Sequence, residues 1–160
     1  MPASAADYFR IMSRAIFQAG LSWKLIESKW PAYERLFEGF DPALVAAFGE
    51  GDIDRIAADP SIVRTRKKVA ATVANARTLL LLEREYGSFA AYLRGFGTYA
   101  ERSADLRRRF HFLGELSVYY LLFLVGEDVP SLEEWERTIP GDHPRIREMV
   151  ALARSEDERR

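Results

Sequence analysis

The sequence contains no cysteine and only two histidines, His111 and His143. The absence of cysteine excludes disulfide bridges, thiolate zinc sites and cysteine nucleophiles. A catalytic zinc ion needs about three protein ligands, and two histidines in unrelated contexts do not supply them. We therefore expect neither a bound metal nor another cofactor.

Long hydrophobic runs and an excess of charge of either sign are also absent. The longest apolar stretch, Leu116 to Val125, has about ten residues, whereas about twenty are needed to cross a bilayer. The formal net charge is -1 at pH 7, so any surface that attracts nucleic acid must be local. The segment from Met1 to Asp7 lacks the basic and apolar regions of a signal peptide. We expect a cytoplasmic protein without membrane contact.

Hydrophobic residues at helical spacing dominate the chain of 160 residues, which is 48% hydrophobic and 29% charged. The clearest stripe, Val69, Val73, Ala76 and Leu80, predicts a long helix over residues 67–86. No segment alternates with the period of a strand. We expect one compact all-α domain over residues 1–160, with many short helices and one core.

Helix boundaries follow from caps and prolines. Asp7 is expected to cap the first helix, and Pro31 is expected to separate a helix over residues 23–29 from another over residues 32–37. The last helix is expected to begin near Pro144 and to fray over the charged tail, residues 155–160.

A tight turn from His111 to Gly114 separates a helix expected over residues 103–110 from the apolar helix that follows. Such a turn leaves the unpaired amides at the start of the second helix available to a phosphate. Three arginines, Arg107, Arg108 and Arg109, precede it. This unit predicts a helix-hairpin-helix clamp for the DNA backbone. An ordinary helix joint with a solvated basic end fits the same spacing.

A second joint, from Gln18 to Trp23, combines an amide side chain, a glycine, an apolar residue and an indole. Gly20 is able to take a positive φ, and Ser22 is able to cap the next helix. These residues suit a wedge that fills a gap in a base stack and holds an extruded base. A core tryptophan beside a glycine required by the backbone is the alternative.

A third basic cluster opens the long helix, where positive charge opposes the helix dipole. Its members are Arg64, Arg66, Lys67 and Lys68. An anionic partner would explain them, and a solvated basic face is the alternative.

Together these segments resemble the 3-methyladenine DNA glycosylase I family, within the helix-hairpin-helix DNA glycosylases. The resemblance runs in order from about Tyr8 to Gly126. It rests on residues 17–23 (FQAGLSW), 40–42 (FDP) with 45–47 (VAA), 62–64 (IVR) with Arg66 and Lys68, 75–77 (NAR), and 109–114 (RFHFLG).

The resemblance implies a DNA repair hydrolase that flips an alkylated purine of the 3-methyladenine type out of duplex DNA and cuts its N-glycosidic bond. Its partner would be double-stranded DNA containing alkylated bases. The protein would act on this DNA as a monomer, at the nucleoid. Gly20 and Leu21 would enter the gap left by the base, Trp23 would stack in the pocket, and Gln18 would line it.

The resemblance also assigns the DNA backbone contacts. The hairpin residues His111, Leu113 and Gly114 would grip phosphates. The supporting basic residues would be Arg64, Arg66, Lys68, Arg107, Arg108 and Arg109.

Two departures from the family change the expected chemistry. The family carries a pocket glutamate three residues before this glutamine, at the position of Ala15. Its N-terminal segment, with a pocket tyrosine and zinc ligands, has no counterpart, and residues 129–135 (VPSLEEW) replace the C-terminal zinc ligands. Zinc is therefore not expected.

A substitute for the missing glutamate would have to be another carboxylate, able to stabilise the developing positive charge on the sugar. The candidates are Asp128, Glu133, Glu134 and Glu115. A cationic N-alkylpurine is already a good leaving group, so the pocket alone would support weak catalysis. The alternatives are a catalytically inactive protein of the same fold that binds damaged or abasic DNA, and a purely structural helical domain.

Overall fold

The computed structural model describes residues 4–159, except for the side chains of Arg145, Met149, Leu152, Ala153, Glu156 and Asp157. The described chain is helical without a strand, which confirms the all-α prediction. The elements in order are α1 (Ala5–Gln18), α2 (Trp23–Leu36), the 3-10 turn η1 (Glu38–Phe40), α3 (Pro42–Ala46), α4 (Glu50–Ala57), α5 (Arg66–Tyr86), α6 (Phe89–Arg94), α7 (Tyr99–Arg109), α8 (Glu115–Leu124), α9 (Leu132–Thr138) and α10 (Pro144–Glu158). Within these bounds no helix is both long and apolar enough to span a membrane.

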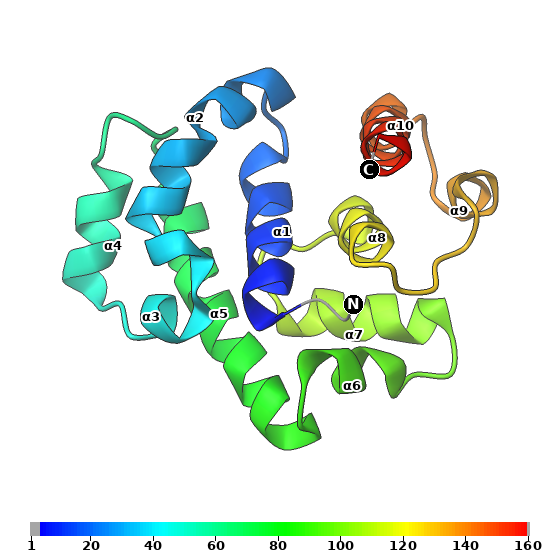
Figure 1. Ribbon diagram of the computed structural model, residues 1–160, viewed down its shortest axis with the longest axis horizontal. Coiled ribbons are helices and arrows are strands. Elements are labelled where there is room, and N and C mark those ends of the chain that lie inside the picture. The colour runs from blue at the N-terminus through cyan, green and yellow to red at the C-terminus, as the bar shows by residue number, and fades with distance from the viewer. Residues whose placement is uncertain (1–3, 160) are drawn as a thin grey trace.

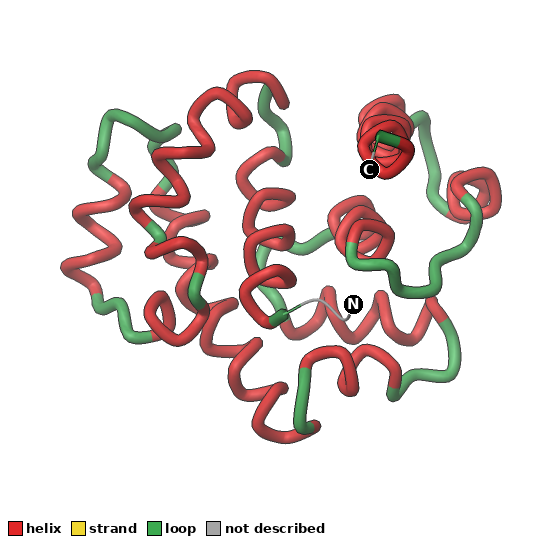
Figure 2. The backbone as a smooth tube through the Cα atoms, in the orientation of Figure 1, coloured by secondary structure: helices red, strands yellow, loops and turns green. Residues whose placement is uncertain are grey.

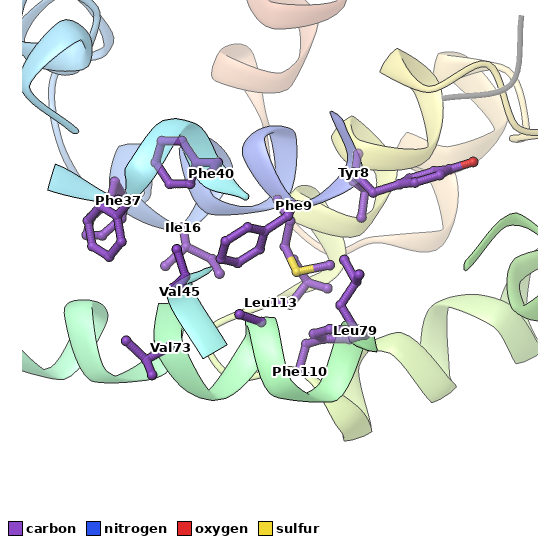
Figure 3. Packing of buried hydrophobic residues seen from close by; sticks show 14 of the residues in the cluster. Tyr8, Phe9, Ile16, Phe37, Phe40, Val45, Val73, Leu79, Phe110 and Leu113 are labelled. Carbon is purple, nitrogen blue, oxygen red and sulfur yellow. The ribbon is translucent and has the colours of Figure 1, made fainter. Parts of the chain in front are cut away.

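Helix α1 lies at the centre of the molecule, between α2 to α5 on one side and α8 to α10 on the other (Figure 1). Short loops join the helices (Figure 2). The main core forms where α1 meets α5 and the segment that joins α7 to α8. Phe9 of α1, Leu79 of α5, and Phe110 and Leu113 of the joining segment meet there (Figure 3). Burial of such large apolar side chains is the main stabilising term of the fold.

A smaller apolar cluster holds the C-terminal helices against α1 and α8. It contains Ala15, Tyr119, Tyr120, Trp135, Ile146 and Val150. Trp135 of α9 stacks on Tyr119 of α8 with ring centroids 4.7 Å apart. Helix α9 and the loop before it are therefore held by aromatic packing.

The predicted break at Pro31 was wrong, because α2 continues through it from Trp23 to Leu36. A proline inside a helix costs about 3 kcal/mol. Trp30 and Tyr33, on either side of Pro31, are both buried and stack on each other with ring centroids 5.4 Å apart. Their burial anchors both halves of α2 to the core and outweighs the lost hydrogen bond.

Three other boundaries differ from the prediction. Ser4, and not Asp7, caps α1, while Asp7 completes a capping box with it. Helix α7 begins at Tyr99, because Thr98 caps it. Helix α10 extends to Glu158, beyond the Ser155 at which we expected fraying.

Two polar side chains of α5 tie neighbouring segments to the long helix. Asn75, which is 1% exposed, donates from Nδ2 to the His111 carbonyl at 3.1 Å and accepts the His111 amide at 2.8 Å. Arg77 donates to the carbonyls of Ala46 and Phe48, at the end of α3, at 2.9 and 2.7 Å. Asn75 thus fixes the backbone of the hairpin on α5.

We expect Asn75→Ala to lower the free energy of unfolding by about 2–4 kcal/mol, because both His111 backbone groups lose their partner. The matched control is Thr78→Ala on the same helix, which removes only a bond to the Ala74 carbonyl and should change stability by less than about 0.5 kcal/mol. Chemical denaturation measures both. Equal stability of the Asn75 variant and the wild type would contradict this role.

Candidate functional site

The segment between α7 and α8 forms the predicted helix-hairpin-helix motif. Helix α7 ends at Arg109 and α8 begins at Glu115, with Gly114 as its N-cap. Within the described residues no side chain caps the first turn of α8, so its first amides lack an intrahelical partner. Phe112 bends the turn with a left-handed φ of +58°.

A cavity of about 420 Å³ lies beside this hairpin. Its walls come from the end of α1, the hairpin, the start of α8 and one residue of α10. The lining residues are Ala15, Gln18, Ala19, Gly20, Phe112, Gly114, Leu116, Ser117 and Ile146. None of them carries a charge, and we refer to this cavity as the neutral pocket.

Gln18 is the most polar side chain of the neutral pocket. It is 6% exposed, and neither its Oε1 nor its Nε2 has a hydrogen-bond partner among the described residues. Leaving a buried donor and acceptor unpaired costs about 1–3 kcal/mol for each group. A ligand with a complementary donor and acceptor would recover that cost.

The turn after Gln18 takes the conformation that the sequence predicted. Gly20 has a left-handed φ of +77°, and Ser22 caps α2 by accepting the Leu25 amide at 3.4 Å. Lys68 of α5 donates from Nζ to the Ala19 carbonyl at 2.9 Å and braces the turn. Gly20 therefore lies at the pocket with its backbone held from α5.

Leu21 and Trp23 do not line the neutral pocket. Leu21 is half-buried against the main core. Trp23 is half-buried at the start of α2, and its indole Nε1 is buried without a described partner. The structure thus brings Ala15, Gln18 and Gly20 together, with the other two residues beside them.

Arg66, one of the predicted DNA-binding residues at the start of α5, is paired within the protein. Its guanidinium contacts Glu50 at 2.6 Å and Asp54 at 3.0 Å, both in α4. Those ion pairs explain why Arg66 stands at the start of α5, where the helix dipole disfavours a positive charge. Arg64 and Lys67 have no ion-pair partner among the side chains that the structure describes.

The three arginines at the end of α7 also have carboxylate partners. Arg107 pairs with Glu115 at 3.2 Å, while Arg108 and Arg109 contact Asp105 at 2.5 and 2.7 Å. Exposure still separates them, since the side chain of Arg108 is 69% exposed and that of Arg109 is 31% exposed. Arg108 is therefore the most accessible of the three to a phosphate.

Asp105 links Arg108 and Arg109 to α6, because its carboxylate also accepts a hydrogen bond from the Tyr92 hydroxyl. We refer to these four residues as the Asp105 cluster. Burial raises the pKa of the Asp105 carboxyl, but hydrogen bonds from Tyr92, Arg108 and Arg109 outweigh burial, so the net pKa lies below the ordinary value of 3.8. Burial, followed by the bond to Asp105, raises the pKa of the Tyr92 hydroxyl. The ionised carboxylate is the form that the cluster stabilises.

The four candidate carboxylates lie outside the lining of the neutral pocket. Glu115 and Glu134 line a different cavity of about 480 Å³, with Tyr99 and Trp135. Glu133 is exposed and pairs with Arg137 at 3.1 Å. Asp128 is exposed, and its carbonyl accepts from Arg102 at 3.0 Å. None of the four lines the neutral pocket.

The sequence did not indicate some of the residues that line the neutral pocket. Phe112 lies inside the predicted hairpin, but nothing in its spacing indicated a pocket. Leu116 and Ser117 appeared only as members of an apolar helix. Ile146 comes from α10, more than a hundred residues along the chain from Gln18, and no local signal could have placed it there.

Solved structures of DNA glycosylases share this helical arrangement, which places the fold in the all-helical DNA glycosylase class. A glutamate-to-glutamine variant of 3-methyladenine DNA glycosylase I from Staphylococcus aureus is 33% identical, with a TM-score of 0.68 over 80% of this chain and 83% of that chain. A variant of 3-methyladenine DNA glycosylase I in complex with 3-methyladenine is 34% identical, with a TM-score of 0.64 over 74% of this chain and 75% of that chain.

The methyladenine glycosylase family model matches residues 2–117, and the chain belongs to this family. DNA-3-methyladenine glycosylase of Haemophilus influenzae is 30% identical over 130 residues, which cover 68% of this chain and 70% of that protein. DNA-3-methyladenine glycosylase 1 of Escherichia coli is 39% identical over 79 residues, or 49% of this chain. That match spans only 42% of the Escherichia coli protein. Helices α9 and α10 lie outside the family match.

The Asp105 cluster predicts a pH dependence of stability. The folded state holds the pKa of Asp105 below its unfolded value, so this carboxylate adds stability above about pH 4 and loses it as the pH falls through the folded pKa. We expect Asp105→Asn to be less stable than the wild type at neutral pH, with a gap that narrows below about pH 4. Thermal unfolding at several pH values measures this. A gap that stays constant on acidification would refute the assignment.

Proposed function

We propose that this protein is a monofunctional DNA glycosylase that releases alkylated purines of the 3-methyladenine type from duplex DNA. It acts as a cytoplasmic monomer on nucleoid DNA, with no lyase step. The observation that carries the proposal is the unpaired amide of Gln18 in a neutral pocket whose volume of about 420 Å³ falls among ligand-sized cavities. Family membership supports the same reaction class.

Base flipping fits the parts of the site. An enzyme that acts on a base in a duplex must extrude it into a pocket, at the cost of its pairing and stacking. The Gly20 turn and Leu21 would fill the gap in the duplex, and Trp23 would support the base from the start of α2. The Gln18 amide offers one donor and one acceptor to the edge of the base.

The hairpin would bind the DNA backbone. The unpaired amides at the start of α8 suit a phosphate, with His111, Leu113 and Gly114 around it. Arg64 and Arg108 are the accessible cations of the predicted set, while Arg66, Lys68, Arg107 and Arg109 position the surrounding segments through their internal partners. Such contacts bind duplex DNA without reading its sequence.

The neutral pocket limits the chemistry to labile bases. A purine alkylated at N3 carries a positive charge, so cleavage of its glycosidic bond releases a neutral base and needs no added proton. The sugar cation left behind takes up water, which then loses a proton. Because no carboxylate lines the pocket, we propose that lability of the substrate replaces acid catalysis.

Release of free methylated bases from methylated duplex DNA tests the proposal. We expect Gln18→Leu to slow release by about tenfold to a hundredfold, as one or two lost hydrogen bonds to the base predict. Its stability should be equal or greater, because the change removes an unpaired buried amide. Glu133→Gln is the matched control and should release bases at the wild-type rate. Absence of release by well-folded wild type would refute the activity.

Ala15 favours a second candidate function. Its apolar side chain stands where the family carries a pocket glutamate, and it packs in one cluster with Ile146. A protein that binds damaged or abasic duplex without cutting it needs the wedge and the hairpin but no acid. Tight binding to an abasic duplex, together with no base release, would favour this function.

A further inference from the structure

Phe112 is an aromatic residue that the fold leaves about half exposed. Its side chain is 52% exposed, and its backbone has a left-handed φ of +58°, which bulky residues rarely adopt. Its neighbours Phe110 and Leu113 are buried in the core. The hairpin thus directs its two flanking apolar residues inward and leaves Phe112 at the surface.

The position of Phe112 is fixed by its neighbour. Asn75 holds both the amide and the carbonyl of His111, at 2.8 and 3.1 Å. Because Asn75 is buried on α5, these two bonds fix the chain immediately before Phe112. The exposed ring therefore stands on a rigid part of the turn, which lowers the entropic cost of binding through it.

Phe112 belongs to two cavities at once. On one side it lines the neutral pocket with Gln18 and Gly20. On the other it lines a groove of about 680 Å³ between α5 and the hairpin. The groove is lined by Arg66, Lys67, Ala70, Ala71, Ala74, His111 and Phe112. The Phe112 ring thus borders both the groove and the neutral pocket.

The charge of the groove suits a nucleic acid backbone. Lys67 is exposed and has no ion-pair partner among the described residues. No carboxylate lines the groove, although Glu50 and Asp54 reach Arg66 from α4. A free cation beside an exposed aromatic ring is the combination with which proteins bind unpaired nucleotides.

We propose that this groove binds an unpaired nucleotide of the DNA strand, with its base stacked on Phe112 and its phosphate near Lys67. The inference rests on the proposed function, since the strand that places one base in the neutral pocket carries the adjacent nucleotide to Phe112, which borders both cavities. That nucleotide leaves its own base pair to enter the groove. The groove is then the site of the nucleotide next to the flipped one. Stacking there stabilises the opened strand.

Binding of a fluorescein-labelled oligothymidine of about eight nucleotides, measured by anisotropy, tests the groove directly. We expect Phe112→Ala to weaken binding by about 5- to 150-fold, which corresponds to the loss of one base–aromatic stack. Phe112→Leu should also weaken it, because leucine has no flat π-face. The control is Leu81→Ala, which removes an equally exposed apolar side chain (49%) from α5 outside the groove.

The salt dependence of oligothymidine binding tests the proposed contact between Lys67 and a phosphate. Lys67→Ala should lower the slope of log affinity against log salt by about 0.7, the contribution of one phosphate contact in a single strand. Arg84→Ala, an exposed cation near the other end of α5, should leave the slope unchanged. Equal slopes for the wild type and Lys67→Ala would remove the phosphate contact from the proposal.

The proposed nucleotide-binding groove and the proposed glycosylase function can be refuted independently of each other. Oligothymidine binding that is the same for wild type, Phe112→Ala and Phe112→Leu overturns the groove, whatever the base-release assay shows. Loss of binding in both Phe112 variants supports the groove, even if no protein releases methylated bases.

Discussion

Two hydrogen bonds between the buried Asn75 side chain and the His111 backbone, one donated and one accepted by Asn75, hold the hairpin on α5, and the candidate site depends on them. The hairpin supplies Phe112 and Gly114 to the neutral pocket and leads directly into α8. Lys68, also on α5, holds the opposite turn through the Ala19 carbonyl. One long helix therefore positions both turns of the site, and a rigid scaffold of this kind gives binding residues a fixed geometry.

The C-terminal helices complete the pocket with apolar surface. Ile146 of α10 is buried with Ala15 in one cluster and lines the neutral pocket, although α10 lies outside the family match. A buried carboxylate at position 15 would meet this apolar wall and lose its hydration, at a cost that a neutral residue avoids. Ala15 and Ile146 are thus compatible neighbours, and together they give the neutral pocket an apolar wall beside the Gln18 amide.

The sequence predicted the parts of this molecule that depend on local signals. The helical periodicity of α5, the hairpin after Arg109 and the positive φ of Gly20 all arise from residues close in the chain. The break expected at Pro31 failed because tertiary burial of Trp30 and Tyr33 overrides local propensity. The partners of Arg66 come from a different helix, and Ile146 reaches the pocket from the other end of the chain. Such long-range contacts have no signature in a single sequence.

The most direct test of the account is an NMR titration of the protein with free 3-methyladenine, followed through the Gln18 side-chain amide. We expect saturable shifts of that signal and of the Gly20 and Gly114 backbone amides, all of which belong to the neutral pocket. Shifts confined to Tyr99 and Trp135, which line the cavity beside Glu115 and Glu134, would place the base elsewhere. That result would contradict the central claim that Gln18 receives the base.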